Sequence, residues 1–185
     1  AKDCFLVDMG ACPPELVSHI RNSGLTVKAV LLTHGHFDHI MGLDRFLEEF
    51  PVSVYACAAE KELLESPQLN SSSGMLGQSY TFHGAQYVKD GDLLEIAGMK
   101  IRVIQTPGHT IGGCCYYIAD EQTLFSGDTL FRASIGRTDL PTGSMSALVR
   151  SVKEKILVLP DETRVYPGHM EETTVGYEKK YNPFL

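Results

Sequence analysis

A run of mostly apolar, largely β-branched residues over positions 27–33 ends directly in the polar hexapeptide His34-Gly35-His36-Phe37-Asp38-His39. The run shows no continuous polar face, which is typical of a buried strand. Over positions 38–50 the apolar residues recur at helical spacing, so we expect a helix to follow at once. The three histidines and the aspartate are therefore expected where a strand passes into a helix.

The first third of the chain alternates strand and helix signals. A second strand is predicted at 52–56 and a short helix at 58–64, which together give a βαβα beginning. Positions 66–79 are rich in Ser, Asn, Gly, Gln and Pro, a composition that indicates a long surface loop and not a packed element. Loops of this length often border functional sites.

Strand signals dominate the second half. We predict two hairpins, with strands at 93–97, 100–106, 114–119 and 123–126. Ser144 is a suitable N-cap for a helix to about position 158, and a last strand at 163–166 precedes a polar final helix. The order of elements therefore predicts an α/β protein.

Length and composition fit one globular domain over positions 1–185, because 43% hydrophobic residues suffice to bury a core. The net charge of −7, without a basic stripe, argues against nucleic acid as a partner. No stretch approaches the roughly 18 apolar residues that span a bilayer, and the first residues lack the features of a signal peptide, so no membrane partner is expected. The five cysteines form an odd set without regular spacing, which favours free thiols in a reducing cytoplasm.

Three further short motifs each place a histidine or an aspartate after an apolar strand. They are Thr-Pro-Gly-His109-Thr, Ser-Gly-Asp128-Thr and Tyr-Pro-Gly-His169. A Gly-Asp or Gly-His pair by itself indicates only a turn, and we interpret His19 and His83 as ordinary surface or hydrogen-bonded residues. Together with the hexapeptide the motifs have no simple packing explanation, because so many desolvated polar groups need an ion to satisfy them. We therefore expect four loops to converge on a metal site at one edge of the sheet core.

Imidazole nitrogens and carboxylate oxygens suit zinc, iron or manganese. His34 and His36 stand two positions apart in an irregular loop, so both can face one ion. Asp38 and His39 begin the following helix and can face a second ion. The two oxygens of Asp128 could bridge both ions, so we expect two divalent cations, zinc first among them.

The hexapeptide matches in full the HxHxDH signature of the metallo-β-lactamase superfamily, which the chain resembles over essentially its whole length. The resemblance implies an αβ/βα sandwich of two mixed β-sheets flanked by helices, with the site at one edge. It also implies that His34, His36 and His109 hold the first ion, that Asp38, His39 and His169 hold the second, and that Asp128 bridges them.

Within the superfamily the chain looks most similar to short, glyoxalase II-like hydrolases. The supporting segments are TPGHTIGG (106–113), SGDTLF (126–131), IGRTD (135–139), YPGH (166–169) and the tail at 177–184. Family members normally begin with a strand pair ahead of the segment that positions 5–10 resemble, so N-terminal strands are expected to be missing here. The helical C-terminal domain that binds glutathione in full-length glyoxalase II has no counterpart, so glutathione specificity does not follow from the resemblance.

The resemblance implies hydrolysis of a small thioester or ester, S-lactoylglutathione being one candidate, by a hydroxide that bridges the two metals. Metal coordination lowers the pKa of water to about 7 and polarises the carbonyl under attack. Asp38 is the candidate catalytic residue, expected to orient the second metal and the hydroxide. Arg137 is a candidate for binding a substrate carboxylate, because guanidinium pairs bidentately with it, and an exposed structural role fits Arg137 equally well.

Two other functions fit the same motifs. Persulfide dioxygenases share the HxHxDH run and a Gly-Arg-Thr-Asp-like segment but use one iron, which His34, His109 and Asp128 would hold as a two-histidine, one-carboxylate triad. A non-catalytic metal-binding module would keep the same ligands. Lactonase and β-lactamase activities are weaker alternatives, since the best-known zinc β-lactamases carry Cys where this chain has Asp128.

Overall fold

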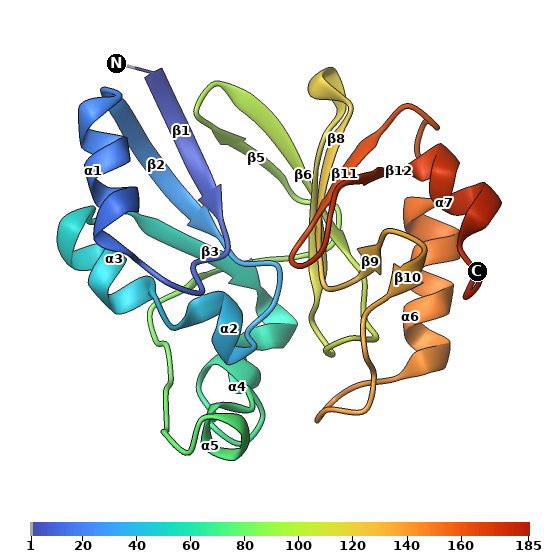
Figure 1. Ribbon diagram of the computed structural model, residues 1–185, viewed down its shortest axis with the longest axis horizontal. Helices are drawn as coiled ribbons and strands as arrows, with labels where there is room; N and C mark the ends of the chain where they lie inside the picture. Colours follow the sequence, from blue (N-terminus) through green and yellow to red (C-terminus); the bar gives the residue numbers. More distant parts are fainter. Residues whose placement is uncertain (1) are drawn as a thin grey trace.

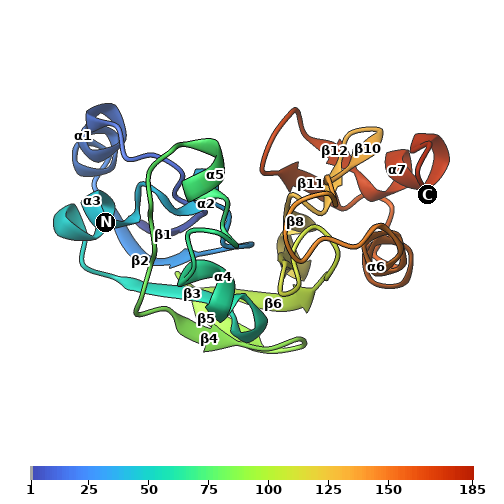
Figure 2. The same ribbon diagram turned by 90° about the horizontal axis from the view of Figure 1, so that it is seen from below.

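The computed structural model describes residues 2–185, which form two β-sheets packed face to face with helices on the outer side of each (Figures 1 and 2). The first sheet has the order β1-β2-β3-β4 and is parallel throughout. Its strands are β1 (Lys2–Val7), β2 (Leu25–Leu31), β3 (Ser53–Cys57) and β4 (Gln86–Val88).

The second sheet has the order β12-β11-β8-β7-β6-β5, and only the β8-β11 pair within it is parallel. Its strands are β5 (Leu93–Ile96), β6 (Met99–Gln105), β7 (Cys114–Ile118), β8 (Thr123–Gly127), β11 (Arg164–Pro167) and β12 (Thr173–Thr174). A separate antiparallel pair consists of β9 (Leu130–Phe131) and β10 (Ser134–Ile135). Two mixed sheets were expected. The second sheet is mixed, whereas the first is entirely parallel.

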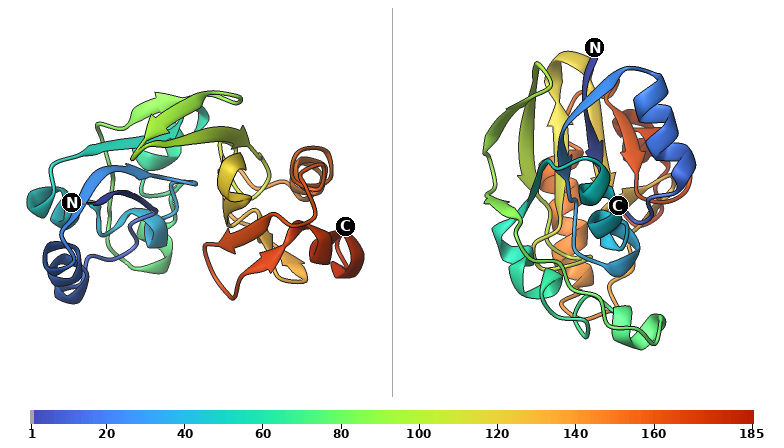
Figure 3. Two further views of the ribbon diagram at one scale, coloured as in Figure 1. Left: turned by 90° about the horizontal axis from the view of Figure 1, so that it is seen from above. Right: turned by 90° about the vertical axis from the view of Figure 1, so that its left-hand side faces the viewer.

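Helices cover the outer face of each sheet, so the αβ/βα sandwich expected from the sequence is confirmed (Figure 3). Helices α1 (Pro14–Asn22) and α3 (Leu43–Glu49) cover the first sheet, and α6 (Met145–Ser151) and α7 (Val175–Tyr181) cover the second. The short helices α2 (Phe37–Ile40), α4 (Lys61–Leu64) and α5 (Ser72–Met75) lie below the first sheet in the view of Figure 1. Single 3-10 turns occupy Ala58–Glu60 and Ala119–Glu121.

Three clusters of buried side chains correspond to the three interfaces between these layers. Val30 in β2 packs with Ile20 and Phe46 between the first sheet and its helices, whereas its neighbour Leu31 packs between the two sheets. On the other side, Leu124 packs with helix residues such as Leu148 and Val152. Because side chains alternate across a strand, β2 serves two cores at once, which explains why its sequence lacks a continuous polar face.

The helix predicted over 38–50 is wrong as one element, since the structure has α2 and α3 with a break at Met41 and Gly42. The backbone N–H of Gly42 donates to the carbonyl oxygen of Met9 at 2.8 Å. A Cβ atom at Gly42 would lie 2.6 Å from the carbonyl carbon of Ala11. The helix is therefore interrupted where the chain after β1 crosses it, a contact that helical periodicity does not reveal.

The loop predicted at 66–79 as an unpacked surface segment is wrong in part, because it contains α5 and the buried residues Asn70 and Ser72. The amide of Asn70 donates to the carbonyl of Tyr80 at 2.8 Å and accepts the N–H of Ser72 at 2.9 Å. The carbonyl of Asn70 accepts the N–H of Phe37 at 3.0 Å. One asparagine thus fastens the loop to itself and to the hexapeptide.

The remaining predicted elements are present with small shifts at their ends, including both hairpins and the strand at β11. Ser144 caps α6 as expected, its hydroxyl accepting the N–H of Ala147, and the helix then continues as a π-helical segment, Val152–Ile156, where one regular helix was expected. All five cysteines are free thiols, as expected. Across residues 2–185, no helix is both long and apolar enough to cross a membrane.

Candidate metal centre

Four chain segments bring the predicted ligand residues to one edge of the sandwich. The hexapeptide follows β2, His109 follows β6, Asp128 follows β8 and His169 follows β11. Strands β6, β8 and β11 run in the same direction, so their carboxyl ends meet at a common edge. The convergence predicted from the sequence is therefore present in the fold.

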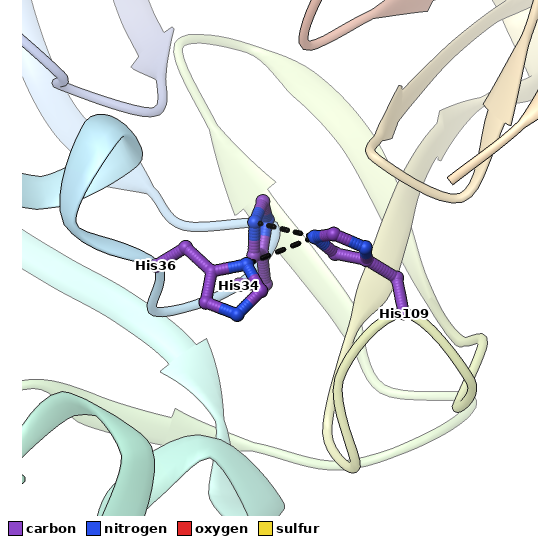
Figure 4. A group of neighbouring side chains, drawn as sticks. All are labelled: His34, His36 and His109. Atoms are coloured by element: carbon purple, nitrogen blue, oxygen red, sulfur yellow. Dashed lines mark hydrogen bonds between the residues drawn. The ribbon is translucent and has the colours of Figure 1, made fainter. Parts of the chain in front are cut away.

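His34, His36 and His109 form the first group, with three ring nitrogens facing one another (Figure 4). Nε2 of His109 lies 2.9 Å from Nδ1 of His36 and 3.2 Å from Nε2 of His34. Nitrogens bound to one tetrahedral zinc at about 2.0–2.1 Å lie roughly 3.3 Å apart. The spacing of the three nitrogens thus fits a single shared cation.

The hydrogen bonds around two of these rings fix which nitrogen faces the centre. The hydroxyl of Thr33 donates to Oδ2 of Asp8 at 2.8 Å, so its oxygen can only accept from Nδ1 of His34 at 3.0 Å. Nδ1 of His109 donates to the carbonyl oxygen of Arg137 at 2.7 Å. Both rings therefore present an unprotonated Nε2 inward, which is the form that binds a metal.

Burial also keeps the first group neutral. Burial, helped by the neighbouring His109 and His39, lowers the pKa of His36 to about 3. Burial, together with the surrounding histidines, lowers the pKa of His34 well below its ordinary value, and burial likewise lowers that of His109. Protons therefore compete weakly for these three lone pairs near neutral pH.

Asp38, His39 and His169 form a second group beside the first. Oδ2 of Asp38 lies 3.2 Å from Nε2 of His169 and 3.8 Å from Nε2 of His39. His39 is buried, whereas Asp38 and His169 are exposed. The second group thus offers a donor set for a cation that is open to solvent on one side.

Asp128 lies between the two groups. Its Oδ1 is 3.4 Å from Nε2 of His39, and its Oδ2 is 3.6 Å from Nε2 of His109 and 3.5 Å from Nε2 of His169. One carboxylate thus reaches histidines of both groups.

Several polar atoms of the cluster lack a hydrogen-bond partner although they are buried. They are Nε2 of His36, Nε2 of His39 and Oδ1 of Asp128. An unpaired buried polar atom costs about 1–3 kcal/mol. Nε2 of His36 is on the opposite side of its ring from Nδ1, which faces His109, so the other two atoms are the ones that call for a ligand within the cluster. Two of them, on His39 and Asp128, face each other across 3.4 Å, as donors to one cation would. The residues present therefore fit divalent metal.

Two carboxylates support the cluster, the half-buried Asp8 and the buried Glu60, and sequence reasoning missed both. Asp8, at a φ of 60° just after β1, accepts the N–H and hydroxyl of Thr33 and the Nδ1–H of His39, each at 2.8 Å. Burial alone would lower the pKa of His39, but the carboxylates of Asp8 and Asp128 outweigh it and raise that pKa well above its ordinary value. An acidic residue directly after the first strand was the signal that could have pointed to Asp8.

Glu60 is the second supporting carboxylate and is 1% exposed. Its Oε2 accepts the N–H of Gly35 at 2.8 Å, and its Oε1 accepts the N–H of Gly112 at 2.7 Å. Gly35 lies between His34 and His36, and Gly112 follows His109 by three positions. The side chain of Glu60 therefore connects the two loops that carry the first group. No local sequence pattern indicates this contact.

Arg137 lies beside the cluster, but its guanidinium points to a different partner from the one expected. Its Nε and Nη2 donate to Oδ1 and Oδ2 of Asp139 at 2.8 and 2.7 Å. Its contribution to the cluster is the carbonyl oxygen that accepts from His109. Binding of a substrate carboxylate by Arg137 stays a prediction, and it would compete with Asp139.

Comparison with known proteins agrees with this geometry. A family model described as the Metallo-beta-lactamase superfamily matches residues 1–169. The probable metallo-hydrolase YqgX of Bacillus subtilis is 40% identical over 183 residues, which cover 98% of this chain and 87% of that protein. Hydroxyacylglutathione hydrolase GloC of Haemophilus influenzae is 32% identical over 186 residues, which cover 100% of this chain and 88% of that protein.

A solved structure shows the same fold. The crystal structure of BLEG-1 B3 metallo-beta-lactamase matches with a TM-score of 0.94 and 40% identity, covering 99% of this chain and 88% of that one. The chain therefore belongs to the metallo-β-lactamase superfamily. Within that superfamily it is a metallo-hydrolase.

Proposed function

We propose that the chain hydrolyses a small thioester or ester at a two-metal centre, with S-lactoylglutathione as one candidate substrate. The observation that carries this proposal is the position of Asp128 between His39 and His109, at 3.4 and 3.6 Å. A carboxylate offers two oxygens, so Asp128 suits a role as the bridge between two ions. Paired ions of this kind commonly serve hydrolysis.

The proposed ligands follow the two groups. His34, His36 and His109 would hold the first ion, Asp38, His39 and His169 the second, and Asp128 both. Zinc is the proposed metal, and the same nitrogen and oxygen donors also suit iron or manganese. The similarity to GloC, named as a hydroxyacylglutathione hydrolase, supports a thioester substrate.

The bound ions would supply a nucleophilic water at neutral pH and an electrophile for the substrate carbonyl. The chain's own residues hold and orient the reacting groups. Asp38 is 3.2 Å from His169 and open to solvent, so its free oxygen is placed to accept a proton from an entering water. Asp8 and the carbonyl of Arg137 fix the ring orientations of His39 and His109, so the donors need no rearrangement when substrate enters.

The test is turnover by purified protein loaded with two equivalents of zinc. We expect it to hydrolyse a thioester without oxygen and to hold two metals per chain. Asp128→Ala should lower kcat by at least 100-fold, because the bridge between the ions is lost. The exposed Asp120→Ala serves as the matched control and should retain full activity.

Other outcomes would favour other functions. One iron per chain, with oxygen uptake on glutathione persulfide, would identify a persulfide dioxygenase that uses His34, His109 and Asp128. A substrate panel should include lactones and β-lactams, the latter because of the similarity to BLEG-1. If wild type and Asp128→Ala were equally inert on every substrate, the chain would be a non-catalytic metal-binding module.

We further propose that residues 1–185 act as one domain and that the protein works in the cytoplasm on a small-molecule substrate. Five free thiols, four of them buried within the sheet core or beside it, support a reducing compartment. Limited proteolysis that leaves the chain intact and unfolding in one transition would support the single domain.

A further inference from the structure

A cavity of about 400 Å³ lies against the metal cluster. Part of its wall consists of cluster residues, namely His36, Asp38, His109, Asp128 and His169. Any substrate that reaches the cluster from this side must place the rest of its structure in the cavity. The chemistry of the remaining wall therefore bears on which substrates the site accepts.

The remaining wall is largely apolar. Its apolar side chains come from five segments of the chain and are Phe37, Met75, Phe131, Ile135, Leu140 and Met170. The other lining residues are two serines, Ser71 and Ser134, and Arg137. Apolar walls with a few polar groups are typical of sites that bury an apolar ligand moiety.

Outside the metal cluster, the described residues that line the cavity give an anionic substrate group little to pair with. Apart from the histidines of the cluster, Arg137 is the one basic residue among those lining the cavity. One edge of its guanidinium, formed by Nε and Nη2, is already occupied by Asp139 in a bidentate pair. A substrate carboxylate would have to displace Asp139 from that edge, or pair with the remaining edge beside the negative charge of Asp139. Neutral groups are thus favoured over acidic ones in this cavity.

The apolar wall is held in place by the tail that follows β12. The buried carboxylate of Glu178 accepts the N–H of Ala133 at 3.0 Å and the hydroxyl of Thr173 at 2.6 Å. The amide of Asn182 donates to the carbonyl of Ser134 at 3.0 Å. These bonds fix the turn between β9 and β10, the two strands that carry Phe131 and Ile135. This part of the cavity wall is therefore preformed, and substrate binding would not have to order it.

We propose that this cavity receives the apolar acyl chain of the substrate, so that the protein prefers thioesters or esters of uncharged, medium-length acyl groups. The inference rests on the proposed hydrolytic function. In the reaction, water supplies a hydroxyl to the acyl carbon and a proton to the departing sulfur or oxygen. The C–S or C–O bond breaks, and the products are a carboxylic acid and a thiol or alcohol.

The first test is binding, measured by calorimetry on the metal-loaded protein with the straight-chain acids acetate, butyrate, hexanoate and octanoate. Each methylene moved from water into an apolar cavity should tighten binding by about fourfold until the cavity is full. The second test is kcat/KM for acyl thioesters of the same chain lengths on one common thiol. We expect the same rise with chain length.

Rim variants tie the preference to this cavity. Met75 and Met170 are 55% and 69% exposed, so Met75→Asp and Met170→Asp place a charge at the rim without disturbing the core. Each should reduce the octanoyl-to-acetyl ratio of kcat/KM by at least tenfold. Met145→Asp is the matched control, because Met145 is 48% exposed and does not line the cavity, and it should leave the ratio unchanged.

The outcomes separate the two proposals. Equal kcat/KM for acetyl and octanoyl thioesters, with acid affinity independent of chain length, would overturn the acyl-chain inference and leave the hydrolase intact. Affinity that rises with chain length in a protein inert on all thioesters and esters would refute the hydrolase and retain the cavity as an apolar binding site. A chain-length preference that survives both rim variants would place the acyl chain elsewhere.

Discussion

Nδ1 of His39 lies 2.8 Å from Oδ2 of Asp8, a residue 31 positions earlier that is not itself part of the hexapeptide. The same carboxylate accepts the hydroxyl of Thr33, which in turn accepts from His34. Through these two bonds Asp8 sets the protonated nitrogen of a histidine in each proposed ion site. The carboxylate of Asp8, behind the cluster, thus governs the ring orientations of both His34 and His39.

Replacement of Asp8 by asparagine should weaken metal binding by about 10–100-fold, the usual cost of losing a carboxylate behind a ligating histidine. The amide cannot accept from His39 and Thr33 as strongly as the carboxylate does. Chelator competition measures the effect. Asp3→Asn is the control, because Asp3 lies on the strand that leads to Asp8 and is exposed. Equal affinities of the two variants would contradict this role of Asp8.

Glu60→Gln should destabilise the fold by about 1–3 kcal/mol. Glutamine keeps one oxygen, so one of the two N–H donors, on Gly35 or Gly112, would face an NH₂ group in a buried place. Urea unfolding of the metal-free protein measures the change. The neighbouring Glu62→Gln, at an exposed position, should unfold like wild type. If the two variants proved equally stable, Glu60 would not be joining the loops.

Gly168→Ala should disturb Asp128, the proposed bridge between the two proposed ion sites. A Cβ atom there would lie 2.4 Å from Oδ1 of Asp128 and 2.7 Å from Cε1 of His39. Asp128 would have to shift, so we expect metal analysis to show fewer than two ions per chain after mild dialysis. Gly74→Ala, where nothing lies within 4 Å, is the control. Full metal content in both variants would show that Asp128 can move without loss of metal.

Stability should fall above pH 9 because of buried thiols. Burial raises the pKa of Cys115 from 9.0 to about 11, and that of Cys114 well above 9.0. Below pH 9 the thiols are protonated in both states, whereas above it the unfolded chain ionises first and unfolding becomes easier. Each thiol contributes at most about 1.4 kcal/mol per pH unit. Urea unfolding at pH 8 and pH 10.5 measures the slope, which Cys115→Ala should reduce; an unchanged slope would contradict the assignment.

The sequence was sufficient to predict the strand-to-loop arrangement that carries the cluster. The apolar run and the polar hexapeptide are adjacent in the chain, so rules based on local sequence patterns apply to them. His109, Asp128 and His169 were predictable for the same reason, because each follows an apolar strand. The αβ/βα order followed from the resemblance, whose motifs extend through the chain.

Contacts distant in sequence account for what local rules missed. In the sequence, Glu60 looks like an ordinary polar residue of a short helix. Its role follows only from its partners, Gly35 and Gly112, which lie on two other loops. Gly42 reads as a tolerable helical residue until the backbone of Ala11 is found against it. The sequence around Asn70 resembles an ordinary loop. It does not indicate that the side-chain amide donates to the backbone of Tyr80 and accepts from the backbone of Ser72.

The candidate ligands come from both sheets, and His34 and His109, which face each other across them, stand 75 positions apart. Bringing the two rings together costs loop-closure entropy, because the long stretch of chain between them must form a closed loop first. The cluster should therefore assemble late in folding, after each half has collapsed. A cation that binds at that stage would stabilise the folded state after the transition state has passed. It would therefore slow unfolding and leave the rate of folding almost unchanged.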